Sequence, residues 1–231
     1  MSIKDMKQRY HLISSILSLV LTAILLVCIC FAWFISNKEV SVTGISVSSS
    51  DGALYDISLT RYKAIEDGDI YNIDYNTTQI DPFDILNPYS KVIYEIKFKT
   101  DVLDFDTLDM FLQTTTSTDI PGLIYDGTSY YNYLSNVCSF SWLTKVTDGF
   151  SIDENCSNIG FSFENDTIRQ TTVLVKENMT SLSLFQSNGY YYIYLLFDYD
   201  TIKINRIFSY NIGFTGNKIY FKEDVSFIIK M

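Results

Sequence analysis

The longest apolar stretch of the chain runs from Leu12 to Ile35 and contains no charged residue. A helix of about 20 mostly apolar residues is long enough to cross the hydrocarbon core of a bilayer. A helix packed inside a soluble domain normally shows a polar stripe along one side, and this stretch shows none. The pattern therefore predicts that residues 12–35 form one helix that inserts into a membrane, as a transmembrane anchor or as a signal sequence.

The charges that precede this helix predict its orientation. Lys4, Lys7 and Arg9 lie just before it, and basic residues next to a spanning helix favour the cytoplasmic side. We therefore expect a cytoplasmic basic tail over residues 1–11 and an extracellular domain over residues 38–231.

Two fates of the helix remain open. Ala32 is a small residue directly ahead of Trp33, as a signal-peptidase site requires. The apolar stretch is nevertheless longer than the roughly 7–15 residues of an ordinary signal-peptide core. The protein either stays in the cell membrane with its C-terminal domain outside, or is secreted after cleavage between Ala32 and Trp33.

The clearest strand of the outer region is an alternation of apolar and charged residues. The apolar set is Val92, Tyr94, Ile96 and Phe98, and the charged set is Lys91, Glu95, Lys97 and Lys99. A period of two places the sets on opposite faces of a strand. The pattern predicts a half-buried strand over residues 91–99.

The other apolar runs are short and close together. Asn188-Gly189 separates two of them and is a strong hairpin signal. Residues 190–194 hold four tyrosines, which could form a sugar- or partner-binding surface, but an alternating strand that divides them between its two faces explains them more simply. Residues 202–204 and 208–214 also read as strands.

Composition supports the same class of fold. The region is rich in Tyr, Phe, Ile, Val and Thr, which favour strands. About eight to ten closely spaced strands predict one all-β domain, a β-sandwich.

Charge excludes one class of partner. Of the 17 Lys and Arg, 14 lie after residue 37, together with 26 of the 27 Asp and Glu, so this region has a formal net charge of −12. Such a surface repels nucleic acid. We expect no nucleic-acid partner.

Candidate catalytic and metal-binding residues are sparse. His11 is the only histidine and falls on the predicted cytoplasmic side, so the outer domain has no imidazole for a zinc site or a Ser-His-Asp triad. Acidic clusters at residues 66–69, 104–106 and 198–200 offer oxygen ligands for calcium, but none fits a twelve-residue calcium loop. We expect no enzyme activity and no cofactor.

Cys138 and Cys156 are the two cysteines of the outer region, where disulfides persist. A bond between them would close a short loop and stabilise the domain by roughly 3 kcal/mol. We expect this disulfide, with two free thiols as the alternative.

The segment that follows the apolar stretch resembles the camelysin family of bacterial surface proteins and related biofilm-matrix fibre subunits. The resemblance rests on the aromatic residues 31–34, on Asn37, on residues 40–47 leading into 54–59, and on the run 85–98. It implies an exported protein with a jelly-roll-like β-sandwich. Tyr89 stands where the family usually has glycine. Some members are described as metallopeptidases, an activity that a chain without HExxH or an outer histidine does not support.

In fibre-forming relatives the segment just after the signal completes the sheet of a neighbouring subunit, a form of strand addition. The matching residues here are Val40, Val42, Ile45 and Val47. The alternative is that this run pairs within its own domain.

Together these features predict a non-catalytic structural protein of the bacterial cell surface or extracellular matrix. Its partners would be the membrane, through residues 12–35, and copies of itself or other surface proteins. The alternative function is a membrane-tethered ectodomain that binds a glycan or calcium.

Overall fold

The chain divides into two compact units, Met1–Lys38 and Glu39–Met231, and each is described by itself. The computed structural model describes residues 15, 18–22, 24, 38–42, 45–49, 54–75, 91–101, 104–116, 119–120, 122–125, 127, 130–210 and 219–231.

In the first unit the described residues between 15 and 24 are helical. The Thr22 hydroxyl donates a hydrogen bond to the Ser18 carbonyl at 2.8 Å, which satisfies a polar side chain within the helix itself. Within the described part of the chain, no helix combines the length and the apolar character needed to cross a membrane. The remaining residues of the predicted helix 12–35, including Ala32 and Trp33, lie outside the described residues.

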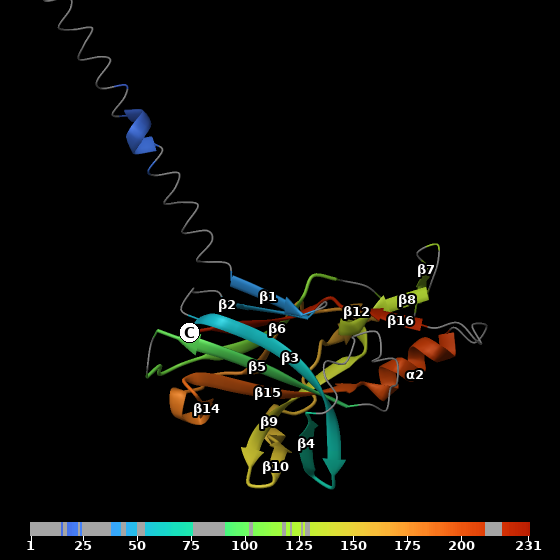
Figure 1. Cartoon of the computed structure of the whole chain (residues 1–231). Helices are drawn as coiled ribbons and strands as arrows, with labels where there is room; N and C mark the ends of the chain where they lie inside the picture. The colour runs from blue at the N-terminus through green and yellow to red at the C-terminus, as the bar shows by residue number, and fades with distance from the viewer. Residues whose placement is uncertain are drawn as a thin grey trace, which may run out of the picture. The chain divides into compact units, whose positions relative to one another are not determined.

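The second unit is built mainly from two sheets whose strands are mostly antiparallel (Figure 1). The first has the order β1-β2-β17-β6-β13. Its strands are β1 (Lys38–Val42), β2 (Ile45–Ser49), β17 (Val225–Lys230), β6 (Asp109–Thr114) and β13 (Thr172–Lys176). The second has the order β14-β15-β5-β3-β4-β10-β9. Its strands are β14 (Phe185–Ser187), β15 (Tyr190–Tyr199), β5 (Val92–Thr100), β3 (Leu54–Asp67), β4 (Ile70–Asp74), β10 (Gly149–Ile152) and β9 (Cys138–Val146).

Smaller elements complete the unit. A three-stranded sheet joins β16 (Ile219–Lys222), β8 (Tyr130–Tyr133) and β7 (Ile124–Tyr125), and a short hairpin joins β11 (Phe163–Glu164) to β12 (Thr167–Ile168). The helical elements are η2 (Leu134–Asn136), η3 (Glu154–Cys156), η4 (Ser181–Ser183) and α2 (Thr201–Tyr210). The prediction of an all-β domain is confirmed.

The second sheet closes into a ring of six strands. β15 pairs with β5 along one edge and with β9 along the other, and the hairpins β3–β4 and β9–β10 meet where Phe150 pairs with Tyr71. Gly149 lies at this junction with a φ of +149°. A Cβ there would come within 2.7 Å of the Tyr71 carbonyl oxygen, so the two hairpins approach this closely because residue 149 has no side chain.

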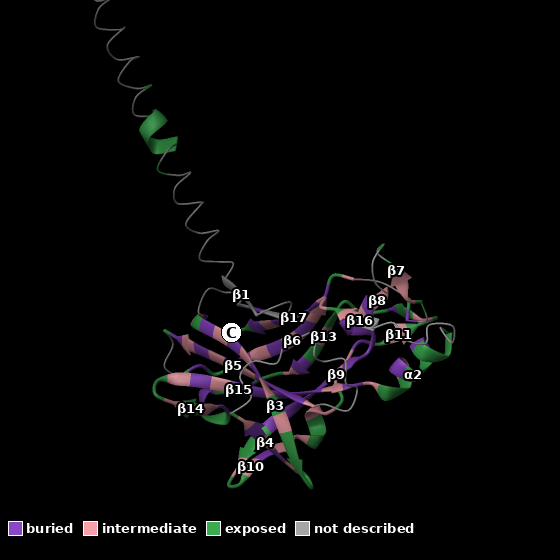
Figure 2. Ribbon diagram, turned by 45° about the vertical axis from the view of Figure 1, so that its right-hand side comes forward, coloured by how far each residue is buried: buried purple, intermediate pink, exposed green. Residues whose placement is uncertain are grey.

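The main core lies between the two sheets. The predicted apolar face of β5 is confirmed, because Val92, Tyr94, Ile96 and Phe98 are all completely buried. Phe227 of β17 contributes from the opposite sheet. Buried residues, purple in Figure 2, concentrate where the sheets face one another, whereas the tips of the β3–β4 and β9–β10 hairpins are exposed.

A second, smaller core fills the ring on the other face of the same strands. It contains Tyr71 and Ile73 of β4, Ile93 of β5, Leu143 of β9, Phe150 of β10, and Tyr194 and Leu196 of β15. The strands β5, β9 and β15 therefore bury both faces, which explains why only part of their sequence alternates between apolar and polar residues.

Two local predictions have opposite outcomes. Asn188 and Gly189 both have positive φ, and Ser187 pairs with Tyr190, so the predicted hairpin is confirmed. The strand predicted over residues 202–204 is wrong, and so is the described part of the strand predicted over 208–214, because residues 202–204 and 208–210 belong to α2. The Asp200 carboxylate accepts hydrogen bonds from the backbone N–H groups of Ile202 and Lys203 and so caps the helix. Residues 211–214 of the last predicted run lie outside the described residues.

Candidate functional site

The residues proposed from the sequence as a donor strand lie at one edge of the five-stranded sheet. Val40 and Val42 belong to β1, and Ile45 and Val47 belong to β2. β2 runs parallel to β17, with Val47 opposite Phe227. The Val47 side chain is completely buried in the main core. In this structure the run therefore pairs within its own domain, which is the alternative that the sequence left open.

The opposite edge of this sheet is β13. It pairs with β6 through a register that is broken by a bulge between Leu174 and Lys176. Leu174 is 42% exposed, and among the described strands none pairs with the outer edge of β13. An edge of this kind leaves backbone N–H and C=O groups open to another strand.

The disulfide predicted between Cys138 and Cys156 is not formed, and both residues are free cysteines. Cys138 is completely buried in the main core, and burial raises the pKa of its thiol above the ordinary range. Cys156 ends η3 and packs from the edge of the core, close to Asp153 and Lys176. The two thiols thus have different neighbours, although only 18 positions separate them in sequence.

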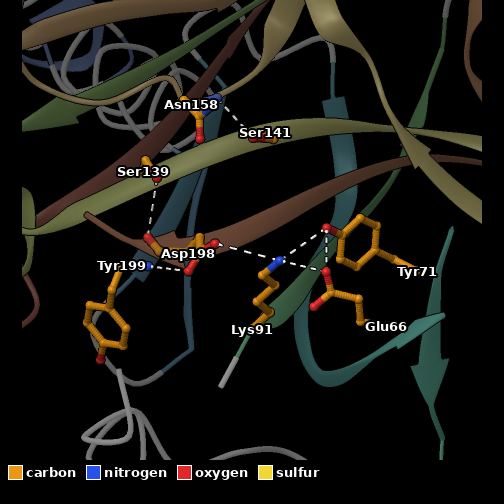
Figure 3. Close-up of polar contacts among 8 residues, drawn as sticks. All are labelled: Glu66, Tyr71, Lys91, Ser139, Ser141, Asn158, Asp198 and Tyr199. Atoms are coloured by element: carbon orange, nitrogen blue, oxygen red, sulfur yellow. Dashed lines mark hydrogen bonds and ion pairs between the residues drawn. The ribbon is translucent and has the colours of Figure 1, made fainter. Parts of the chain in front are cut away.

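Two of the acidic clusters meet at a lysine (Figure 3). Lys91 Nζ lies 3.1 Å from Glu66 Oε1, 3.1 Å from the Tyr71 hydroxyl and 4.0 Å from Asp198 Oδ2. Burial acts to lower the pKa of Lys91, but the hydrogen bonds with Tyr71 and Glu66 outweigh it, and the pKa is raised. Burial raises the pKa of Asp198. The lysine thus occupies the position between these carboxylates that a bound cation would need.

Other acidic residues of these clusters have structural roles. Asp200 caps α2, and residues 66–69 form the end of β3 and its turn into β4. Among the described residues, no group of three or more His, Cys, Asp or Glu side chains is arranged to hold a metal ion.

The tyrosines of β15 divide between the two faces, as the alternation predicts. Tyr191 packs in the main core, and Tyr192 and Tyr194 pack with the core of the ring. The rings of Tyr192 and Tyr194 are almost parallel, with centroids 6.2 Å apart, and Tyr194 contacts Phe150 at 4.5 Å. A ladder of aromatic rings therefore follows this face of β15.

Glu95 of β5 lies half-buried beside this ladder. Burial raises the pKa of Glu95, and a hydrogen bond with Tyr194 opposes the rise only in part. Burial raises the pKa of Tyr62, Tyr75 and Tyr194, and the Glu95 carboxylate adds to each rise. A carboxyl group with a raised pKa is disfavoured in its charged form.

This environment predicts a pH-dependent effect of Glu95→Gln on stability. The folded protein holds the Glu95 proton to a higher pH than the unfolded chain does, so the wild type loses stability as the pH rises above the ordinary glutamate value of 4.5. Glutamine cannot ionise. The thermal midpoint of Glu95→Gln should therefore rise relative to wild type between pH 4.5 and 7.

The measurement is thermal unfolding of both proteins across this range. Glu154→Gln, which removes an exposed carboxyl on η3, is the matched control. A Glu95→Gln midpoint that falls relative to wild type with rising pH would contradict the prediction.

A pocket opens where two strands, β14 and β9, pair with successive parts of the same edge of β15. β14 pairs with Tyr190–Tyr192, and β9 pairs with the stretch from Tyr194 onward. Between them lies a cavity of about 250 Å³. Its lining residues are Trp142, Leu143, Thr144, Lys145, Lys176, Ser183, Leu184, Phe185, Tyr192 and Tyr194.

Sequence reasoning did not find this pocket. The run 190–194 was its only visible sign, and the remaining walls come from β9, β13, η4 and β14, as far as 52 positions from Tyr194. Comparisons of the chain with protein-family models, with curated proteins and with solved structures found no match. The structure defines the chain as an all-β protein in which one sheet closes on itself.

Proposed function

We propose that this protein is a non-catalytic structural component of the bacterial cell surface or extracellular matrix that assembles through the β1–β2 edge of its five-stranded sheet. The observation that carries the proposal is the position of β2. This strand comes early in the chain, lies next to β17 near the end of the chain, and joins the sheet in parallel. It is held in the sheet by backbone hydrogen bonds and by the buried Val47, which another copy of the same strand would supply equally well.

The strand order supports a jelly-roll-like sandwich, as the camelysin resemblance implies. The orders β2-β17-β6-β13 and β5-β15-β9-β10 place the first of these eight strands beside the last, the second beside the seventh, the third beside the sixth, and the middle two together. This nesting is that of a long hairpin rolled up into two sheets. The hairpin β3–β4 is an addition between β2 and β5, and β2 is parallel to β17 rather than antiparallel.

The proposal places residues 12–35 in the membrane, as an anchor or as a signal cleaved after Ala32, and the domain outside the cell. Support comes from the charges before the segment and from its described residues. Leu19, Leu21 and Ile24 are helical and between 54% and 73% exposed. Apolar side chains exposed around a helix need a lipid or protein environment.

Strand exchange would use the β1–β2 edge of the sheet. If β1 and β2 of one copy leave their own sheet, β17 is uncovered. The same strands of a neighbour then occupy this position, with Val47 filling the same site in the core. The exchanged strands pair with the same partners in a neighbour as in their own copy. The balance between monomer and assembly therefore depends on protein concentration, as in domain swapping.

The test is deletion of residues 38–49 together with competition by a peptide of that sequence. The proposal predicts that the full chain forms oligomers or fibres, that the peptide blocks their formation, and that a scrambled peptide of the same composition does not. The deleted chain should remain monomeric and bind the peptide. Assembly that continues after the deletion would refute strand exchange.

A further inference from the structure

The pocket between β9 and β14 combines aromatic walls with positive charge. Four of its side chains are aromatic, and its only charged side chains are the two lysines, Lys145 and Lys176. The chain as a whole has a formal net charge of −10. A cationic, ring-lined cavity is therefore a local exception to the charge of the protein.

The aromatic walls present flat apolar faces. Tyr192 lies nearly parallel to Tyr194 and contacts Phe185 at 5.6 Å. Trp142 forms part of the wall on the β9 side and is 5% exposed, so its ring is held firmly. Flat rings of this kind pack well against the C–H face of a sugar or another ring, because both surfaces are apolar and rigid.

Each lysine lies over one of these rings. Lys145 Nζ lies 3.7 Å from the centre of the Phe185 ring, and Lys176 Nζ lies 4.8 Å from the centre of the Trp142 ring. A cation–π contact positions the ammonium group without using its hydrogen-bond donors. The two ammonium groups are therefore held at the walls, and the cation–π contacts themselves use none of their donors.

The two lysines differ in their carboxylate partners. Lys176 forms a 2.6 Å ion pair with Asp153, and this contact lowers the pKa of the Asp153 carboxyl. Within the described part of the chain, no carboxylate lies within ion-pair distance of Lys145. Lys145 is thus the side chain that would bind an incoming anion, and Lys176 adds a partly compensated charge.

The volume limits the ligand to about one ring. The cavity, at about 250 Å³, lies below the roughly 300 Å³ at which pockets for drug-sized ligands begin. A simple inorganic anion would leave the aromatic walls unused, and a neutral sugar would leave Lys145 unused. A ring that carries a carboxylate uses both.

We propose that this pocket binds a carboxylate-bearing sugar ring, that is, a uronic acid residue of an acidic polysaccharide. The sugar ring would pack between the aromatic walls, and its carboxylate would accept hydrogen bonds from Lys145. This site is distinct from the β1–β2 edge at which the proposed strand exchange takes place, although Lys176 belongs to β13 at the opposite edge of that sheet. Binding at the pocket and exchange of β1 and β2 can therefore fail or succeed separately.

The experiment uses the full chain in detergent micelles with Trp33→Phe, which leaves Trp142 as the only tryptophan, because the chain has two. Tryptophan fluorescence is followed while D-glucuronate, D-glucose or inorganic phosphate is added. We expect saturable binding of glucuronate, at least tenfold tighter than binding of either glucose or phosphate. The added charge-assisted hydrogen bond accounts for a factor of about ten.

Lys145→Gln is the test variant, and it should weaken glucuronate binding about tenfold, to the level of glucose. Lys230→Gln is the matched control, since Lys230 also lies over an aromatic ring, Phe111, but outside the pocket. It should leave binding unchanged. Because both lysines are exposed, neither variant threatens the fold.

Three results would overturn the proposal. One is the absence of any saturable change with glucuronate. Another is phosphate binding as tight as glucuronate binding, which would indicate a simple anion site. The third is an equal loss of affinity in Lys145→Gln and Lys230→Gln, which would place the ligand on the general surface charge.

Discussion

Glu223→Ala should lower the free energy of unfolding by about 3–5 kcal/mol, because it removes the carboxylate that pairs with a buried arginine. Arg61 Nη1 lies 3.1 Å from Glu223 Oε1, and the two side chains are 1% and 11% exposed. Arg61 extends from β3 into the core beside Tyr94. A guanidinium in this position keeps its charge in the variant and loses its carboxylate. Denaturant unfolding of the full chain in micelles, followed by near-ultraviolet circular dichroism, measures the loss.

The double variant Arg61→Met, Glu223→Ala is the control. It removes both charges, and methionine fills much of the space of the arginine stem, so it should recover most of the lost stability. If Glu223→Ala alone lowers the free energy of unfolding by less than about 1 kcal/mol, the ion pair behaves as an exposed one does.

Phe140→Ala should lower the free energy of unfolding by about 3–5 kcal/mol, because it opens a cavity at the centre of the main core. Phe140 is completely buried. Its ring lies 5.2 Å from the ring of Phe227 in the opposite sheet and 5.4 Å from that of Phe197, measured between centroids. The variant therefore weakens packing both between the sheets and within one sheet. The same denaturant titration measures the effect.

Phe208→Ala provides the comparison for Phe140→Ala. Phe208 lies on α2 and is 47% exposed, and substitution at such a surface position usually changes stability by no more than about 0.5 kcal/mol. Phe140→Leu should cost less than Phe140→Ala because more of the volume is retained. Equal losses of stability in Phe140→Ala and Phe208→Ala would contradict the placement of Phe140 at the centre of the main core.

Several features of the fold could be predicted from local pattern. The alternation in residues 91–99 predicted β5 and its buried face, and Asn188-Gly189 predicted the β14–β15 turn. Both depend on interactions between residues a few positions apart. The error at residues 202–204 has the same origin, because isoleucine favours strands in general. There, the Asp200 cap and the burial of Ile204 and Ile207 on one side of a helix decided the outcome.

The candidate sites depended on contacts between distant segments. Glu66, Lys91 and Asp198 meet although 132 positions separate the first from the last. Nothing in the spacing of the acidic residues shows that a lysine lies between two of the clusters. The prediction of a disulfide failed although only 18 positions separate Cys138 from Cys156, because proximity in sequence does not by itself bring two thiols together.

The amino-acid sequence by itself determined that this protein has an all-β domain, which strand has a buried face, where one tight turn lies and how the charge is distributed. These properties follow from residue type and from a period of two along an extended backbone. Only the tertiary structure decided that one sheet closes into a ring, that β2 pairs in parallel with β17, and that a cationic aromatic pocket opens between β9 and β14. Each of these depends on which strands become neighbours, and strand pairing is set by the packing of the whole core rather than by any local run of residues.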